Sequence, residues 1–162
     1  MFVEFKDLPD SARIWVYQAD RELGEAEQAR ILDFLAKAVD SWLTHGMPMR
    51  GSARVAFNRL IILAADTAFC PPSGCSIDTS TGWLAELGKS MGLDFFNRSI
   101  GYFEDNKLKF FSVFEAKKQV AAGTVGPDTP VVNLQAATIN DPLVIPASQS
   151  FLNRYFVLSN SR

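Results

Sequence analysis

The stretch that decides the fold is residues 54–65, RVAFNRLIILAA. Its early part alternates, with apolar side chains at Val55 and Phe57, and its later part is continuously apolar. A continuous apolar run of this length is typical of a strand that is covered on both faces. We therefore predict one β-strand over Arg54–Ala65.

A strand and two helices flank this run. The β-branched and aromatic residues 14–17, IWVY, predict a first strand. Apolar residues repeat at helical spacing from Glu25 to His45, where Gly46 provides a stop. They repeat again from Ile77 to Met91, where Gly92 caps the end. The chain therefore begins as strand, helix, strand, helix.

The second half predicts a hairpin and shorter elements. Segments 95–102 and 108–113 are strand-like, and their turn, EDNK at 104–107, contains Asp and Asn, which tolerate unusual turn dihedrals. Residues 114–122 predict a short helix, and Val131 and Val132 a short edge strand. Four X-Pro steps beyond residue 125 predict an irregular C-terminal segment.

The element order is therefore roughly β-α-β-α-β-β-α, followed by the irregular end. An early βαβ pattern and a later hairpin favour an α+β fold with a mixed sheet, as one domain over residues 1–162. A regular doubly wound α/β fold is the alternative.

Composition narrows the classes of function. The 162 residues carry a net charge of −2 with a pI of about 5.4, which argues against a dedicated nucleic-acid binder. The N-terminal residues lack the pattern of a signal peptide, and the longest apolar run, Leu60–Ala65, is too short to span a bilayer. We expect a cytoplasmic protein that does not associate with membranes.

Metal and disulfide chemistry are not favoured. Cys70 and Cys75 are too few for a disulfide framework, and free thiols suit a reducing compartment. His45 is the only histidine, so a Cys/His zinc site lacks ligands. We expect no bound metal and no cofactor.

Several blocks resemble a known family. They are Leu8–Gln18, Phe57–Arg59, Ser73–Asp78 and Pro146–Ser150, and the likeness extends over nearly the whole chain. The chain resembles a family of short bacterial proteins that are often labelled "ABC transporter ATPase". The resemblance implies bacterial origin and transfers no catalytic residue.

The sequence argues against the ATPase label. Gly88-Lys89-Ser90 matches the end of a Walker A loop, but the pattern requires glycine where Trp83 stands, and Gly82 is one residue too early. The triplet also falls near the end of a predicted helix, where outward carbonyls disfavour phosphate. No LSGGQ signature is present. We predict that the protein is not an ABC ATPase.

The segment Ser73–Asp78, SGCSID, is the best candidate for a site, because it joins a loop to a helix start. A helix N-terminus favours the thiolate of Cys75, with His45 as a base and Asp66 as its orienting carboxylate. The nearby negative charge of Asp78 would disfavour that thiolate. In the alternative interpretation Cys75 is a small buried residue, and Ser76 or Asp78 caps the helix.

The same junction is also a candidate anion site. Donors at Ser73, Gly74 and Ser76, next to Asp78, would bind a small anion with positive charge from Arg50 or Arg59. A divalent metal between Asp66 and Asp78 is a weaker alternative. A simple helix cap competes with each of these hypotheses and is favoured over them.

No catalytic constellation is complete in the sequence. We therefore predict a non-catalytic binding or protein-interaction domain whose partner is an unknown protein or a small anionic ligand. The alternative is a small enzyme that uses Cys75 with His45, or an anion or metal site at residues 73–78.

Overall fold

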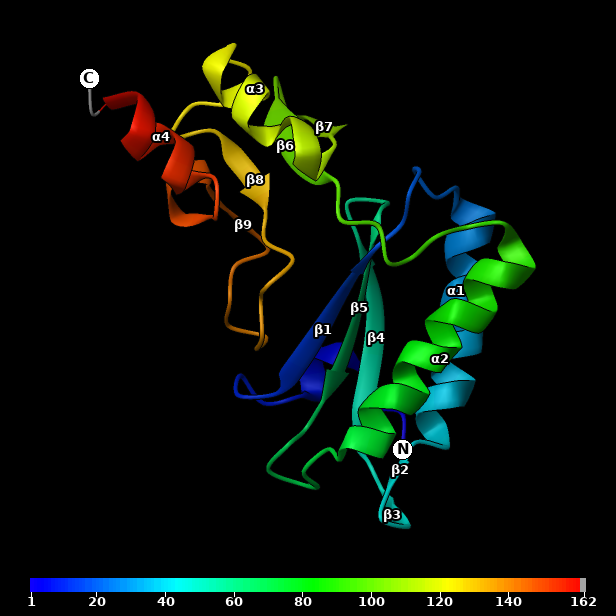
Figure 1. Ribbon diagram of the computed structural model, residues 1–162. Coiled ribbons are helices and arrows are strands. Elements are labelled where there is room, and N and C mark those ends of the chain that lie inside the picture. Colours follow the sequence, from blue (N-terminus) through cyan, green and yellow to red (C-terminus); the bar gives the residue numbers. More distant parts are fainter. Residues whose placement is uncertain (161–162) are drawn as a thin grey trace. The chain divides into compact units, whose positions relative to one another are not determined.

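The computed structural model describes residues 1–160 and confirms the α+β class. The chain divides into two compact units (Figure 1). Unit 1 comprises Met1–Asn97 and Gln135–Asp141, and unit 2 comprises Arg98–Leu134 and Pro142–Arg162. The assignment of residues 1–162 to one domain stays a prediction, and each unit is described separately.

Unit 1 contains a three-stranded antiparallel sheet in the order β1-β5-β4. β5 (Leu60–Ala65) is central, and all six of its residues are buried. It pairs on one side with β1 (Arg13–Gln18) and on the other with β4 (Gly51–Ala56). The apolar run after residue 59 is therefore a strand with a neighbour on each edge and a cover on each face.

The prediction of a single strand over Arg54–Ala65 is wrong. The chain reverses at Phe57, Asn58 and Arg59, so that Ala56 pairs with Leu60. Phe57 and Asn58 adopt left-handed φ values of 54° and 56°. The Leu23 N–H, distant in sequence, donates to the Asn58 carbonyl at 2.8 Å, which is a contact that the local pattern could not reveal.

Two helices cover one face of this sheet (Figure 1). α1 (Glu25–Asp40) buries Ile31, Leu35 and Val39 at helical spacing. α2 (Gly74–Met91) buries Leu84 and Leu87 and ends at Gly92, whose φ of 67° confirms the predicted cap. The apolar stripes of both helices and the facing residues of the sheet form one core.

Three tryptophans lie within or against this core. Trp42 packs edge to face with Trp15, at 5.9 Å between ring centroids, and with Trp83, at 5.2 Å. The Trp42 indole N–H also donates to the Ser76 carbonyl in α2 at 2.9 Å. Trp42 thereby connects the end of α1, the sheet and the start of α2.

α1 is shorter than predicted. It stops at Asp40, and the chain then forms a small hairpin from β2 (Leu43–Thr44) and β3 (Met47–Pro48). His45 and Gly46 form its turn, with φ values of 49° and 78°. Gly46 is therefore a hairpin residue and not the stop of α1, whose C-cap is Ser41.

The other face of the sheet is covered by short segments. η1 (Phe5–Asp7) packs on β4, where the Arg54 guanidinium lies over the Phe5 ring at 5.0 Å. The Ile14 N–H donates to the Ala137 carbonyl at 2.9 Å, which attaches residues 135–141 to β1. η1 thus packs against β4, and residues 135–141 pair along the outer edge of β1.

Unit 2 contains a four-stranded antiparallel sheet in the order β7-β6-β8-β9. The predicted hairpin is confirmed as β6 (Ile100–Glu104) and β7 (Lys107–Phe111). The predicted edge strand is interior instead, because β8 (Pro130–Val132) lies between β6 and β9 (Val144–Pro146). Pairing of β8 with β9, which the proline-rich sequence does not reveal, creates this arrangement.

Short helices cover the core of unit 2. They are η2 (Val113–Glu115), α3 (Ala116–Ala121), η3 (Ala147–Gln149) and α4 (Asn153–Asn160). The predicted irregular C-terminal segment thus contains short regular elements. The main buried residues of this core are Ile100, Tyr102, Phe111, Ala116, Val125, Val131, Ala147, Leu152 and Phe156.

The predicted mixed sheet differs in one respect. Every ladder between the described strands is antiparallel, and parallel pairing is confined to two isolated bridges, Phe2–Gly51 and Gln18–Phe96. The extra reversal at residues 57–59 accounts for this, because it returns the chain antiparallel to β4 before α2 begins.

Candidate functional site

The predicted junction at residues 73–78 is an ordered helix start. Ser73 is the N-cap of α2, and its hydroxyl accepts the Ser76 N–H at 3.1 Å. The Ser76 hydroxyl accepts the Ser73 N–H at 2.8 Å in return. Ser76 is buried, and its carbonyl receives the Trp42 indole N–H. Both serines are therefore committed to the reciprocal capping that begins the helix.

The three residues of the predicted thiol site occupy different elements. Cys75 is exposed on the first turn of α2 and is a free thiol, as is half-buried Cys70. His45 is exposed at the tip of the β2–β3 turn. Asp66 is buried after β5 and accepts the N–H groups of Ala68 and Phe69. Within residues 1–160, no hydrogen bond joins Cys75, His45 and Asp66.

Asp66 instead lies opposite Arg50. The β4–β5 ladder pairs Gly51 with Ala65, and one step further the Asp66 N–H donates to the Arg50 carbonyl at 2.8 Å. Side chains of residues two apart on a strand share a face, so Arg50 and Ser52 point to the same side of the sheet. Arg50 Nε and Ser52 Oγ are both buried, and neither has a partner among the described protein atoms.

Arg59 does not join the junction. It precedes β5, whereas Asp66 follows that strand, so about 20 Å of extended chain separates the two residues. Its Nε donates to the Ala19 carbonyl at 2.9 Å. Burial lowers the pKa of Arg59, while the carboxylates of Asp20 and Glu22 act in the opposite direction. Of the two arginines expected at the anion site, only Arg50 lies at the correct end of the sheet.

The other ligand candidates, Gly74 and Asp78, are exposed on the first turns of α2. No group of three or more His, Cys, Asp or Glu side chains placed to hold a metal ion occurs among the described residues. The arrangement at the start of α2 is therefore that of a capped helix with an exposed thiol.

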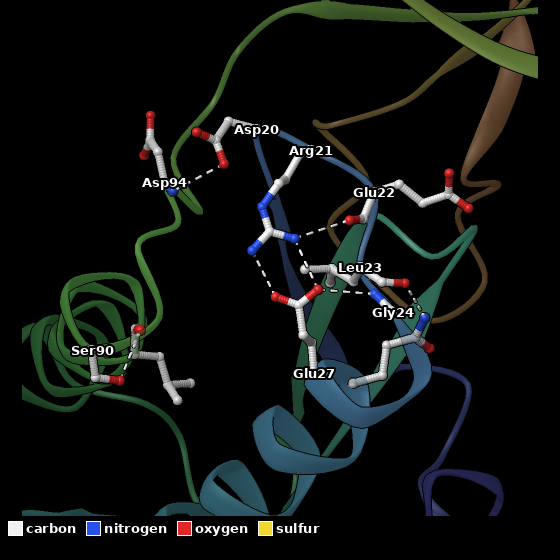
Figure 2. Close-up of polar contacts among 10 residues, drawn as sticks. Asp20, Arg21, Glu22, Leu23, Gly24, Glu27, Ser90 and Asp94 are labelled. Carbon is white, nitrogen blue, oxygen red and sulfur yellow. Dashed lines mark hydrogen bonds and ion pairs between the residues drawn. The ribbon is translucent and has the colours of Figure 1, made fainter.

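The sequence does not reveal a polar cluster at the start of α1 (Figure 2). Arg21 forms a bidentate pair with Glu27, at 2.8 and 2.7 Å, and the Gly24 N–H donates to Glu27 at 3.1 Å. These contacts lower the pKa of Glu27 to about 2. The Asp94 N–H donates to Asp20 at 3.2 Å on the same side. The cluster attaches the loop after β1 to the first turn of α1, which is a structural role.

The most unusual side chain of unit 2 is Phe114, which is 99% exposed. It lies in η2, directly before α3. The sequence predicts a helix here without distinguishing Phe114 from core residues. A signal was available, because Ala116 and Val120 define the buried face, and a residue two positions from Ala116 points nearly the opposite way on a helix.

Comparisons with known proteins add no family assignment. No protein-family model matches the chain, and no curated protein or solved structure matches it significantly. None of the helices in residues 1–160 combines the length and apolarity needed to cross a membrane.

Proposed function

We propose that this chain is a non-catalytic protein-interaction domain of the bacterial cytoplasm and that Phe114 is a principal contact residue. The exposure of the Phe114 side chain carries the proposal. Burying a phenylalanine side chain stabilises a protein by about 2 kcal/mol, and this residue forgoes that gain. Aromatic residues are enriched among the few side chains that dominate binding energy at interfaces.

The backbone beneath Phe114 is well defined. The Phe114 N–H donates to the Ser112 hydroxyl at 3.3 Å, and the Glu115 N–H donates to the Ser112 carbonyl at 2.9 Å. Ala116, two residues on, is fully buried. A ring presented by a fixed turn loses little conformational entropy when a partner covers it.

The start of α2 supports a non-catalytic role. Its serines are used in capping, and no hydrogen bond among the described residues joins the exposed Cys75 thiol to His45 or Asp66. The chain has two cysteines, too few for a disulfide framework, which supports a reducing compartment such as the cytoplasm. The resemblance to short bacterial proteins supports the bacterial origin.

Photo-crosslinking tests the interaction. A benzophenone amino acid replaces Phe114 in cells, and a control carries it at Phe96, which is 43% exposed in unit 1. We expect a discrete protein adduct from position 114 alone. Excess wild-type protein should suppress that adduct, whereas excess Phe114→Ser protein should not. Absence of the adduct, or equal suppression by both competitors, overturns the proposal.

Thiol reactivity tests the enzymatic alternative. Cys75 is alkylated with iodoacetamide at neutral pH in a Cys70→Ser background and compared with a cysteine-containing reference peptide. We expect a rate no greater than that of the peptide. A rate at least about tenfold higher would indicate an activated thiolate and would overturn the non-catalytic assignment.

A further inference from the structure

The two units differ in charge. Unit 2 contains seven Lys and Arg residues against four Asp and Glu, although the whole chain has a net charge of −2. Unit 1 therefore carries the acidic excess. The exposed aromatic side chain at position 114 belongs to the basic unit.

The outer side of α3 combines Phe114 with two cations. Ala116 and Val120 face the core, where they pack with Leu152 and Phe156. Lys117 and Lys118 are exposed, three and four residues after Phe114, which is the spacing of neighbours on a helix surface. Neither lysine forms an ion pair with a described residue.

α4 adds positive charge without a carboxylate. Arg154 is exposed, and its guanidinium lies 5.6 Å from the Phe151 ring centroid and 5.9 Å from that of Tyr155. In the segment of η2 and α3 the one acidic residue is Glu115, which accepts a hydrogen bond from Gln119 at 3.4 Å. We call Phe114, Lys117 and Lys118 the basic aromatic surface.

We infer that the partner is a protein that offers an apolar pocket for the Phe114 ring with carboxylates at the rim for Lys117 and Lys118. This inference rests on the proposed function and specifies the chemistry of its partner. Opposite charges at an interface rim accelerate encounter and fix orientation, and the apolar pocket supplies affinity.

Other macromolecules fit this surface less well. A membrane-surface helix requires a broad apolar face, whereas α3 has six residues and its outer side carries adjacent lysines. Single-stranded nucleic acid requires several stacking rings along a basic groove. The basic aromatic surface contains one ring, which suits one pocket.

Charge reversal tests the inference. In the crosslinking protein, the double change Lys117→Glu and Lys118→Glu is compared with Lys117→Arg and Lys118→Arg, and with Lys89→Glu in unit 1. We expect the glutamate pair to lower the adduct yield at least about tenfold, since like charges at an interface repel. The arginine pair and Lys89→Glu should retain the yield, with all variants folded by circular dichroism.

The outcomes separate the two proposals. The acidic rim is overturned if the Lys117→Glu and Lys118→Glu protein gives the same adduct yield as the parent, or if Lys89→Glu lowers the yield equally. Either result leaves the proposal of an interaction domain intact. No adduct in the parent protein overturns both. Sequencing of the crosslinked partner peptide should find Asp or Glu residues next to the crosslinked position. A crosslinked position without nearby Asp or Glu contradicts the inference. Phe114-dependent sedimentation with phosphatidylserine vesicles, absent with phosphatidylcholine vesicles, would assign the surface to membranes instead.

Discussion

The hairpins β4–β5 and β6–β7 both reverse through two consecutive left-handed residues, but different forces hold the two turns. In the first, the Asn58 carbonyl and side chain accept hydrogen bonds from Leu23 and Gln28, at 2.8 and 3.0 Å. In the second, Asp105 and Asn106 have φ values of 52° and 64°, and their side chains make no hydrogen bond among the described residues. One turn is fixed by distant parts of unit 1, and the other by its own residue types.

The largest effect should come from Gly51, in β4. A Cβ at this position would lie 2.6 Å from the Ala64 carbonyl oxygen and 3.2 Å from the Val39 side chain. The carbonyl belongs to the central strand and cannot move freely, so Gly51→Ala should destabilise the protein by about 3 kcal/mol. Urea denaturation followed by circular dichroism measures the change.

Gly82→Ala is the matched control for Gly51→Ala. Nothing lies within 4 Å of a Cβ at Gly82, which is inside α2. Alanine should therefore be neutral there or stabilising by up to about 1 kcal/mol. An unchanged urea midpoint for Gly51→Ala would show that the β4–β5 ladder is looser than described.

Gly101, in β6, should give an intermediate effect. An added Cβ would lie 2.9 Å from Phe110 and 2.9 Å from Val132, and both contacts are with side chains that can shift. We expect Gly101→Ala to cost about 1–2 kcal/mol, less than Gly51→Ala. Amide hydrogen exchange across β6 and β7 measures it. A free-energy cost larger than that of Gly51→Ala would mean that the β6–β7 hairpin tolerates an added Cβ less well than the β4–β5 hairpin.

The same substitution in the two turns should have opposite signs. Asn106→Gly places the favoured Asp-Gly pair in the two-residue turn and should stabilise by about 0.5 kcal/mol. Asn58→Gly removes the hydrogen bond from Gln28 and should destabilise by about 1 kcal/mol. The melting temperature of each variant tests these expectations. Equal shifts in melting temperature would mean that the hydrogen bonds from Leu23 and Gln28 do not stabilise the β4–β5 turn.

The smallest expected effect is on the pH dependence of stability. It comes from Glu27 at the start of α1, next to the loop that contacts the β4–β5 turn. Glu27 has its pKa lowered from 4.5 to about 2 by Arg21 and the Gly24 N–H. A lowered carboxyl pKa stabilises the fold above pH 4.5, and this stabilisation is lost as the pH falls toward 2. Glu27→Gln should remove the loss of stability that Glu27 causes between pH 4.5 and 2. Glu104→Gln, in the β6–β7 hairpin, should retain that loss. Stability measured across this pH range compares the two variants.

The same contrast explains which parts of the fold the sequence could predict. Asp and Asn identified the turn at 104–107, because their preference for left-handed dihedrals is local. Phe57 conceals the earlier turn, because phenylalanine favours strands and rarely adopts a positive φ. The turn is held by hydrogen bonds that Asn58 accepts from Leu23 and Gln28, which lie at least 30 positions away. Apolar periodicity therefore identified the interior of β5 and missed its beginning.

The candidate site, like the fold, was predicted only in part. Ser73 was expected within a helix start, and the structure places it at the N-cap. Arg59 was expected to supply charge at that start, but it precedes β5 and therefore lies at the opposite end of that strand from Asp66. The donation from Trp42 to Ser76 depends on packing between α1 and α2, which no spacing rule encodes.

The tryptophan cluster gives the protein a built-in optical probe. All three indoles of the chain, at Trp15, Trp42 and Trp83, belong to unit 1, whereas unit 2 contains only the tyrosines Tyr102 and Tyr155. Intrinsic tryptophan emission therefore reports the melting of unit 1 alone. Emission and far-ultraviolet dichroism should coincide during denaturation if the two units melt together, and two separate transitions would reveal independent melting without any added label.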